Sequence, residues 1–185
     1  MYNNEGYNLD TNNKLKNIIL VGMTCSGKTS VAKYISEITD YSFLDTDEVM
    51  EYETSMSIND IFTSKGEECF RMMEHELVHK LAKCEKYIIS TGGGMPVFYN
   101  NMDLLNEIGI TVCLNVHIEI IIKRAEKLAD RPLLKKNHRE VLQKMNKDRV
   151  DFYNKADIIV NASNEDICTL GNIIIEKVQE YLNNI

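Results

Sequence analysis

The sequence predicts an α/β fold with three layers, in which a five-stranded parallel sheet lies between two sets of helices. Short apolar segments alternate with helical patterns along the chain, and this order is typical of a parallel sheet covered on both faces. A glycine-rich segment, "GMTCSGKT", lies between the first apolar segment and the first helical pattern. The length of 185 residues, with 44% hydrophobic and 26% charged residues, fits one globular domain.

Each expected strand is a short apolar run rich in β-branched or aromatic residues. The five runs are 17–22, 41–45, 87–90, 110–116 and 156–160. Helical patterns cover 27–38, 46–53, 57–63, 66–84, 118–128, 139–153 and 165–182. Residues 1–15 are polar and Asn-rich, which predicts a flexible arm, so residues 16–185 form the single expected domain.

Charge and composition exclude several classes of protein. A formal charge of −7 argues against a general nucleic-acid binder or a protein of anionic membranes, although a small anionic ligand needs only a local positive pocket. No apolar run approaches the ~18 residues of a membrane span, and we see no signal-like apolar core near the first residue. The five cysteines form no C-x-x-C pair, which favours free thiols in a reducing cytoplasm.

The strongest motif is the phosphate loop "GMTCSGKT", which matches G-x-x-x-x-G-K-[ST] between a strand and a helix. Its glycines let backbone N–H groups point at phosphate oxygens, and the helix N-terminus adds partial positive charge. Lys28 can bridge the β- and γ-phosphates of ATP, and Thr29 can bind Mg²⁺. The expected nucleotide-binding residues of the loop are Gly22, Met23, Thr24, Cys25, Ser26, Gly27, Lys28 and Thr29.

Two aspartates, Asp45 and Asp47, stand at the end of the second strand, in "FLDTDEVM". If the strand geometry persists to Asp47, Asp45 and Asp47 point the same way, toward the edge where ligands of open α/β sheets bind. One acid can then serve the metal and the other an acceptor hydroxyl. The alternative is a helix N-cap followed by a solvated acid.

Arginine is scarce, so each arginine is a candidate for binding a carboxylate or phosphate through its planar, bidentate guanidinium. Arg71, Arg124, Arg131 and Arg149 stand in separate motifs, and a site that grips both a triphosphate and an anionic acceptor would use several forks. Arg139 lies in a charged segment and is assigned to a solvated surface.

A second pattern, "HELVH", matches the H-E-x-x-H signature of zinc proteases. The apolar face of this helical segment carries Phe70, Leu77 and Leu81, and His75 and His79 fall nearly opposite, toward solvent. A zinc protease would bury that pair and add a third ligand. We therefore interpret both histidines as surface residues.

The motifs "GMTCSGKT", "FLDTD", "IFTSKGEECFRMME", "STGGG", "RPLL" and "RVDFY", in this order, resemble those of the shikimate kinase family. The resemblance covers the chain after residue 15. It implies a fold similar to nucleoside monophosphate kinases, a mobile lid at about 130–139, and ATP- and Mg²⁺-dependent phosphorylation of the shikimate 3-hydroxyl in aromatic amino-acid biosynthesis. The family usually has proline where this chain has Asp151.

The same resemblance implies a role for each matching residue. Asp45 would hold Mg²⁺ through water, together with Thr29, and Asp47 would bind the acceptor hydroxyls and take the proton. Arg71 and Arg149 would grip the shikimate carboxylate, with Glu74 orienting Arg71. Arg131 would reach the transferring phosphate from the lid, and Arg124 would lie against adenine.

Three consecutive glycines, Gly92, Gly93 and Gly94, follow the third strand. Donor and acceptor must approach closely, and side chains at this strand end would fill the gap between them. Bare backbone can also offer N–H groups to the acceptor or the γ-phosphate. A flexible turn would explain one glycine but not three.

Two other functions are consistent with these motifs. Gluconate kinase and other small-molecule P-loop kinases have the same fold, and a shikimate-kinase-like domain can act as a non-catalytic regulatory module. The presence of Lys28 and Asp47 favours catalysis. The expected partner is a small molecule, with no nucleic acid and no membrane, and the expected state is a monomer.

Overall fold

The computed structural model describes residues 16–127, 138–162 and 165–184. Within them, parallel strands form one sheet in the order β2-β3-β1-β4-β5. The strands are β1 (Asn17–Val21), β2 (Ser42–Asp45), β3 (Tyr87–Ser90), β4 (Gly109–Asn115) and β5 (Ile158–Asn161). These five strands are the ones that the sequence predicts, and their ends differ from the predicted ones by at most two residues.

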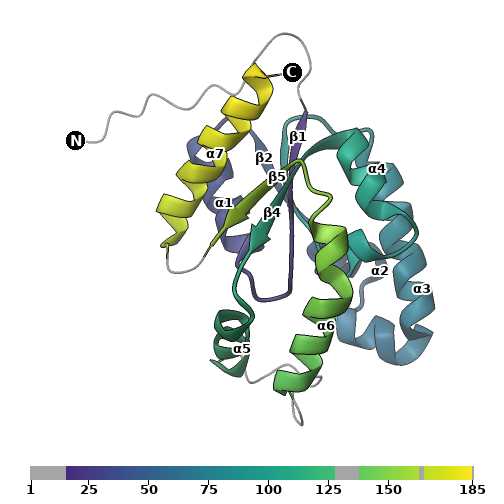
Figure 1. Cartoon of the computed structure of the whole chain (residues 1–185). Helices are drawn as coiled ribbons and strands as arrows, with labels where there is room; N and C mark the ends of the chain where they lie inside the picture. The colour runs from purple at the N-terminus through teal and green to yellow at the C-terminus, as the bar shows by residue number, and fades with distance from the viewer. Residues whose placement is uncertain (1–15, 128–137, 163–164, 185) are drawn as a thin grey trace.

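Helices cover both faces of the sheet (Figure 1). They are α1 (Lys28–Ile38), α2 (Thr46–Thr54), α3 (Ile58–Leu81), α4 (Asn101–Ile108), α5 (Ile118–Lys127), α6 (His138–Tyr153) and α7 (Ile167–Asn183), with a short 3-10 helix η1 (Met95–Val97). α1 and α7 pack together on one face, and α3 and α4 pack together on the other. α5 and the start of α6 lie beyond the carboxyl edge of the strands.

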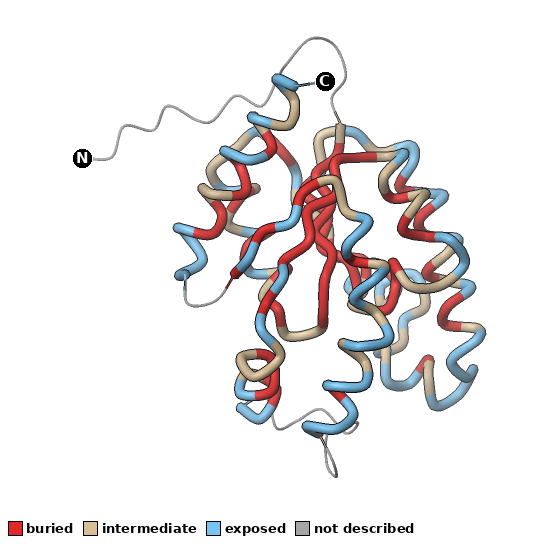
Figure 2. Tube along the Cα trace, in the orientation of Figure 1, coloured by how far each residue is buried: buried red, intermediate tan, exposed pale blue. Residues whose placement is uncertain are grey.

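The core follows from the apolar strands. In β1, the central strand, Ile18 to Val21 are at most 1% exposed, because helices cover both sides of it. Figure 2 shows this buried interior running the length of the sheet. No helix in the described part of the chain combines the length and the apolar character needed to cross a membrane.

Strand order places the two glycine-rich segments side by side. β1 and β3 are hydrogen-bonded neighbours, with Leu20 opposite Ser90. The chain leaves β1 through α1 on one face, and it leaves β3 through η1 and α4 on the other. A crevice forms at such a switch point between neighbouring parallel strands, and ligands of open α/β sheets bind there.

The helical predictions need two corrections. The segments expected at 57–63 and 66–84 form one element, α3, with a kink at Gly66, whose φ of 82° and ψ of 167° are not helical. η1 and α4 were not predicted. α4 has only eight residues, about two turns, and buries Met102 and Leu105. The arm at 1–15 and most of the predicted lid lie outside the described residues.

Candidate active site

The phosphate loop, residues 22–29, joins the end of β1 to the start of α1. Gly22 has a φ of +135°, and a Cβ there would lie 2.8 Å from the Leu114 carbonyl oxygen. Gly27 is the N-cap of α1, with a φ of 102°. Glycine adopts such angles without steric penalty, so the loop curls and presents the N-terminus of α1 to a phosphate.

Lys28 is buried, and the loop itself holds its side chain. Its Nζ donates hydrogen bonds to the carbonyl oxygens of Gly22 (2.9 Å) and Met23 (2.8 Å) and to Ser26 Oγ (3.3 Å). Burial lowers the pKa of Lys28 to about 8, while the charges of Asp47 and Asp45 act in the opposite direction. A bound triphosphate would bring negative charge beside this amine and favour its charged form.

Oxygen-bearing side chains meet at the carboxyl ends of β2 and β3, beside the start of α1. Thr29 Oγ1 donates to Asp45 Oδ2 at 2.9 Å and lies 3.1 Å from Ser90 Oγ. Carboxylate and hydroxyl oxygens are ligands that suit Mg²⁺, and a phosphate-loop hydroxyl with a nearby acid is a recurring pair for it. This donor set therefore fits Mg²⁺.

The two acids of "FLDTD" reach the site differently from the strand prediction. β2 ends at Asp45, whose Oδ1 accepts hydrogen bonds from the N–H groups of Asp47 (3.0 Å) and Glu48 (3.4 Å) and caps α2. Asp47 thus lies in the first turn of a helix, not on an extended strand. It still faces the site, because a Cβ on Gly92 would lie 2.6 Å from Asp47 Oδ1.

The triple glycine is packed against a different part of the site at each position. A Cβ on Gly92 would meet Asp47, and one on Gly93 would lie 2.9 Å from the backbone nitrogen of Thr24 in the phosphate loop. A Cβ on Gly94 would overlap the guanidinium of Arg71, with Cζ at 2.7 Å. Real Cβ atoms are not found at such distances. Asp47, the phosphate loop and Arg71 therefore each pack against a different glycine of this segment.

Arg71 is a buried cation held by carboxylates and aromatic rings. Only 7% of the residue is exposed. Its Nη1 donates to Glu74 Oε2 at 2.7 Å, and its Nη2 donates to Glu67 Oε1 at 3.0 Å. The aromatic ring centroids lie at 4.4, 5.2 and 5.6 Å from its Cζ, for Phe98, Phe70 and Phe62. These contacts hold the planar fork in one orientation.

Glu74 is a buried carboxyl whose pKa is raised. Burial raises the pKa of Glu74 to about 7, the charge of Asp47 acts in the same direction, and Arg71 and Arg149 act in the opposite direction. Arg71 stands on α3 and Arg149 on α6. Two arginines from separate helices thus share one electrostatic neighbourhood with Glu74 and Asp47.

The remaining arginines have different surroundings. Arg124 Nη1 donates to the carbonyl oxygens of Ser26 (2.9 Å) and Cys25 (3.4 Å), so this side chain lies on the phosphate loop. Arg139 is exposed and pairs with Glu119, as the prediction of a solvated residue requires. Arg131 lies outside the described residues.

The two histidines of "HELVH" are only partly as predicted. His79 is exposed, but His75 is half-buried, and its Nδ1 lies 2.7 Å from Oδ1 of the buried Asn101. The Asn101 amide donates to the Met95 carbonyl oxygen, which leaves its Oδ1 to accept from His75. The side chain of α4 that meets His75 could not be foreseen, because α4 itself was not predicted. Among the described residues, no group of three or more His, Cys, Asp or Glu could hold a metal ion.

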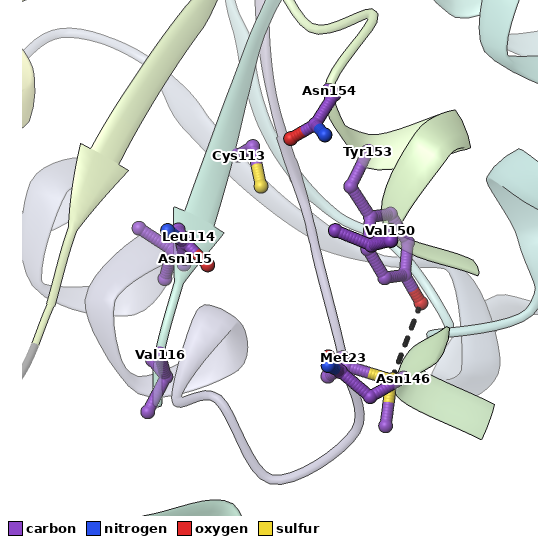
Figure 3. Close-up of a pocket in the computed structure, with 9 residues that line it drawn as sticks. All are labelled: Met23, Cys113, Leu114, Asn115, Val116, Asn146, Val150, Tyr153 and Asn154. Atoms are coloured by element: carbon purple, nitrogen blue, oxygen red, sulfur yellow. Dashed lines mark hydrogen bonds between the residues drawn. The ribbon is translucent and has the colours of Figure 1, made fainter. Parts of the chain in front are cut away.

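A small pocket lies between the phosphate loop, the end of β4 and α6 (Figure 3). Met23, Cys113, Asn146 and Tyr153 are among its lining residues. Burial raises the pKa of Cys113 to about 11, so this thiol stays protonated near neutral pH.

The sequence matches the family model of shikimate kinase over residues 24–183, which is most of the chain. The chain belongs to the shikimate kinase family. A shikimate kinase of Clostridium botulinum (strain 657 / Type Ba4) is 42% identical over 154 residues, covering 82% of this chain and 91% of that protein. A shikimate kinase of Thermoanaerobacter pseudethanolicus is 34% identical over 169 residues, covering 91% and 97%.

Solved structures agree with this shikimate kinase assignment. The shikimate kinase from Acinetobacter baumannii in complex with shikimate has a TM-score of 0.85 at 30% identity, covering 90% of this chain and 94% of that chain. The enzyme from Bacteroides thetaiotaomicron has a TM-score of 0.81 at 32% identity, covering 91% and 98%. A gluconokinase from Sinorhizobium meliloti 1021, with a TM-score of 0.57 at 14% identity, shares the fold alone.

Sequence reasoning missed several residues at the site of this shikimate kinase family member. They are Ser90, Glu67, Phe98 and Tyr153. Ser90 ends β3, beside β1, where a P-loop protein often carries its second acid, so its position was a usable signal. Glu67 stands four residues before Arg71 and Tyr153 four after Arg149, a spacing that puts each pair on one helical face. No local pattern marks Phe98.

Proposed function

We propose that this protein is a shikimate kinase, which transfers the γ-phosphate of ATP to the 3-hydroxyl of shikimate and releases ADP and shikimate 3-phosphate. The observation that carries the proposal is the convergence on the triple glycine. A Cβ added at any of its three positions would collide with one of the site's groups: Asp47, the phosphate loop or the guanidinium of Arg71. A small acidic acceptor with hydroxyl groups matches this combination of groups.

In the proposed reaction, Arg71 and Arg149 bind the carboxylate of the acceptor, and Asp47 aligns its hydroxyl. The hydroxyl oxygen forms a bond to the γ-phosphorus while the bond from that phosphorus to the β–γ bridging oxygen breaks. The hydroxyl proton passes to Asp47, and ADP keeps the bridging oxygen. The transition state is loose, so positioning and charge contribute most of the rate.

The nucleotide side of the proposal rests on the phosphate loop. Lys28 leaves its carbonyl partners to contact the β- and γ-phosphates, and Arg124, which already lies on the loop, borders the adenine. Arg131 is assigned to the transferring phosphate. Thr29 and Asp45, with Ser90 beside them, would hold Mg²⁺, which would supply positive charge to offset that of the phosphates.

The free thiols suit a reducing compartment, so we propose a cytoplasmic location. We also propose that the protein acts as a monomer on a small-molecule substrate, without nucleic acid or membrane.

The test is ADP release with shikimate, gluconate and AMP as separate acceptors. We expect shikimate-dependent release, lost in Asp47→Asn, and no release above background with the other two. Release with gluconate or AMP in place of shikimate would assign another small-molecule kinase. ATP binding without release on any acceptor would indicate a regulatory module.

A further inference from the structure

Tyr153 has no part in the reaction described above, yet it is built into the site. It is the last residue of α6, only 4% exposed, and it stands one helical turn after Arg149. Its ring lines the small pocket beside Met23 and Cys113 (Figure 3). The ring fills space, but its hydroxyl makes a specific contact that packing alone does not require.

The hydroxyl donates a hydrogen bond of 2.6 Å to the carbonyl oxygen of Gly93, the central residue of the triple glycine. It also lies 3.8 Å from Met23 Sδ. A phenol has one proton and a thioether is a weak acceptor, so the proton goes to Gly93. Burial raises the pKa of Tyr153 to about 12, although Arg149 acts in the opposite direction, and the group therefore remains a donor at neutral pH.

Because a peptide unit is planar, this contact also fixes the direction of the N–H group of the next residue. The Gly93 carbonyl and the Gly94 N–H belong to one peptide unit, and no described peptide bond is cis. In a trans peptide the two groups point in opposite directions. Holding the Gly93 oxygen against Tyr153 therefore directs the Gly94 N–H away from α6. On its other side, Gly93 is packed against Thr24 of the phosphate loop.

We propose that Tyr153 is a positioning residue that fixes the Gly93–Gly94 peptide and so sets where the acceptor hydroxyl lies relative to the transferring phosphate. The inference rests on the proposed function. Because Arg149 is on the same helix, α6 would supply both a fork for the acceptor carboxylate and the anchor of the triple glycine. A displacement of α6 would then move both together.

The test compares Tyr153→Phe with Tyr181→Phe in the full chain. Tyr181 also donates through its hydroxyl to a single acceptor, Asp157 Oδ1 at 3.0 Å, and it stands on α7. Each variant loses a phenol hydroxyl, but Tyr153→Phe also removes the contact of that hydroxyl with Arg149, so hydrogen exchange at the triple glycine is needed to isolate the bond to Gly93. We expect Tyr153→Phe to lower kcat/KM for shikimate by about tenfold to 10²-fold, the scale of a misplaced reactant, with the KM for ATP unchanged. Tyr181→Phe should keep wild-type kinetics. Equal kinetics in the two variants would overturn the proposal.

Hydrogen exchange supplies a readout that does not depend on the acceptor. Without nucleotide or acceptor, Tyr153→Phe should exchange faster than wild type in the peptide covering 92–97, and Tyr181→Phe should not. Unchanged exchange there would overturn the inference whatever the substrate is. Faster exchange in a protein that phosphorylates no shikimate would instead contradict the proposed function and leave the anchoring of Gly93 standing.

Discussion

Gly94→Ala tests whether the triple glycine exists to make room for Arg71. Gly94 has φ of −89° and ψ of −25°, which alanine adopts without strain, so the change adds only a methyl group. That methyl would lie 2.7 Å from Arg71 Cζ and 2.9 Å from Nη2, far inside ordinary contact. The guanidinium cannot yield freely, because Glu74 and Glu67 hold it at 2.7 and 3.0 Å.

Displacing the fork breaks at least one charge-assisted hydrogen bond, worth about 1.5–3 kcal/mol. At about 1.4 kcal/mol per tenfold, kcat/KM for shikimate should fall roughly 10- to 10²-fold. The KM for ATP should stay unchanged, since Gly94 faces Arg71. Gly93→Ala is the matched variant, because its methyl would meet Thr24 N at 2.9 Å and should weaken ATP use as well.

A double-mutant cycle decides whether the effect passes through Arg71. If the methyl acts by moving this side chain, Gly94→Ala should add little to the loss already caused by Arg71→Met, because coupled residues are not additive. Steady-state kinetics of the two single variants and the double variant measure this. Wild-type kinetics in Gly94→Ala, or fully additive losses, would refute the reasoning.

Asp47→Asn should bind ATP normally yet lose about 10²–10⁴-fold in turnover, the usual scale for a general base, whereas Asp45→Asn should show a raised Mg²⁺ requirement that excess metal partly rescues. Rescue of the Asp47 variant instead would reverse the two roles. The pKa of Glu74, raised from 4.5 to about 7, stabilises the fold below pH 4.5, and this contribution disappears as the pH rises to about 7. The unfolding free energy of wild type should therefore fall across that window more than that of Glu74→Gln. Urea denaturation that gives both proteins the same change in unfolding free energy between pH 5 and pH 8 would contradict it. Replacing His75 and His79 with Gln should leave kinase activity and metal content unchanged, and stoichiometric zinc that disappears in the double variant would show otherwise.

Local patterns in the chain were enough to predict the strands and the phosphate loop. Apolar runs such as 17–22 and 110–116 form buried strands wherever a sheet is covered on both faces. The spacing in "GMTCSGKT" is similarly local, because the backbone angles at each glycine position themselves require glycine. The resemblance to the family then marked Asp47, Arg71 and the triple glycine as candidates before any contact was known.

The contacts that make these residues a site depend on the three-dimensional arrangement. Asp47 faces Gly92 because α2 starts at Thr46, and not because the strand continues, as the side-chain alternation had suggested. The partner of His75 comes from α4, a helix too short for its pattern to stand out. Tyr153 and Gly93 are 60 residues apart and meet only because α6 packs against the segment that follows β3. Backbone angles and burial periodicity are properties of neighbouring residues, whereas side-chain partners depend on how distant segments pack.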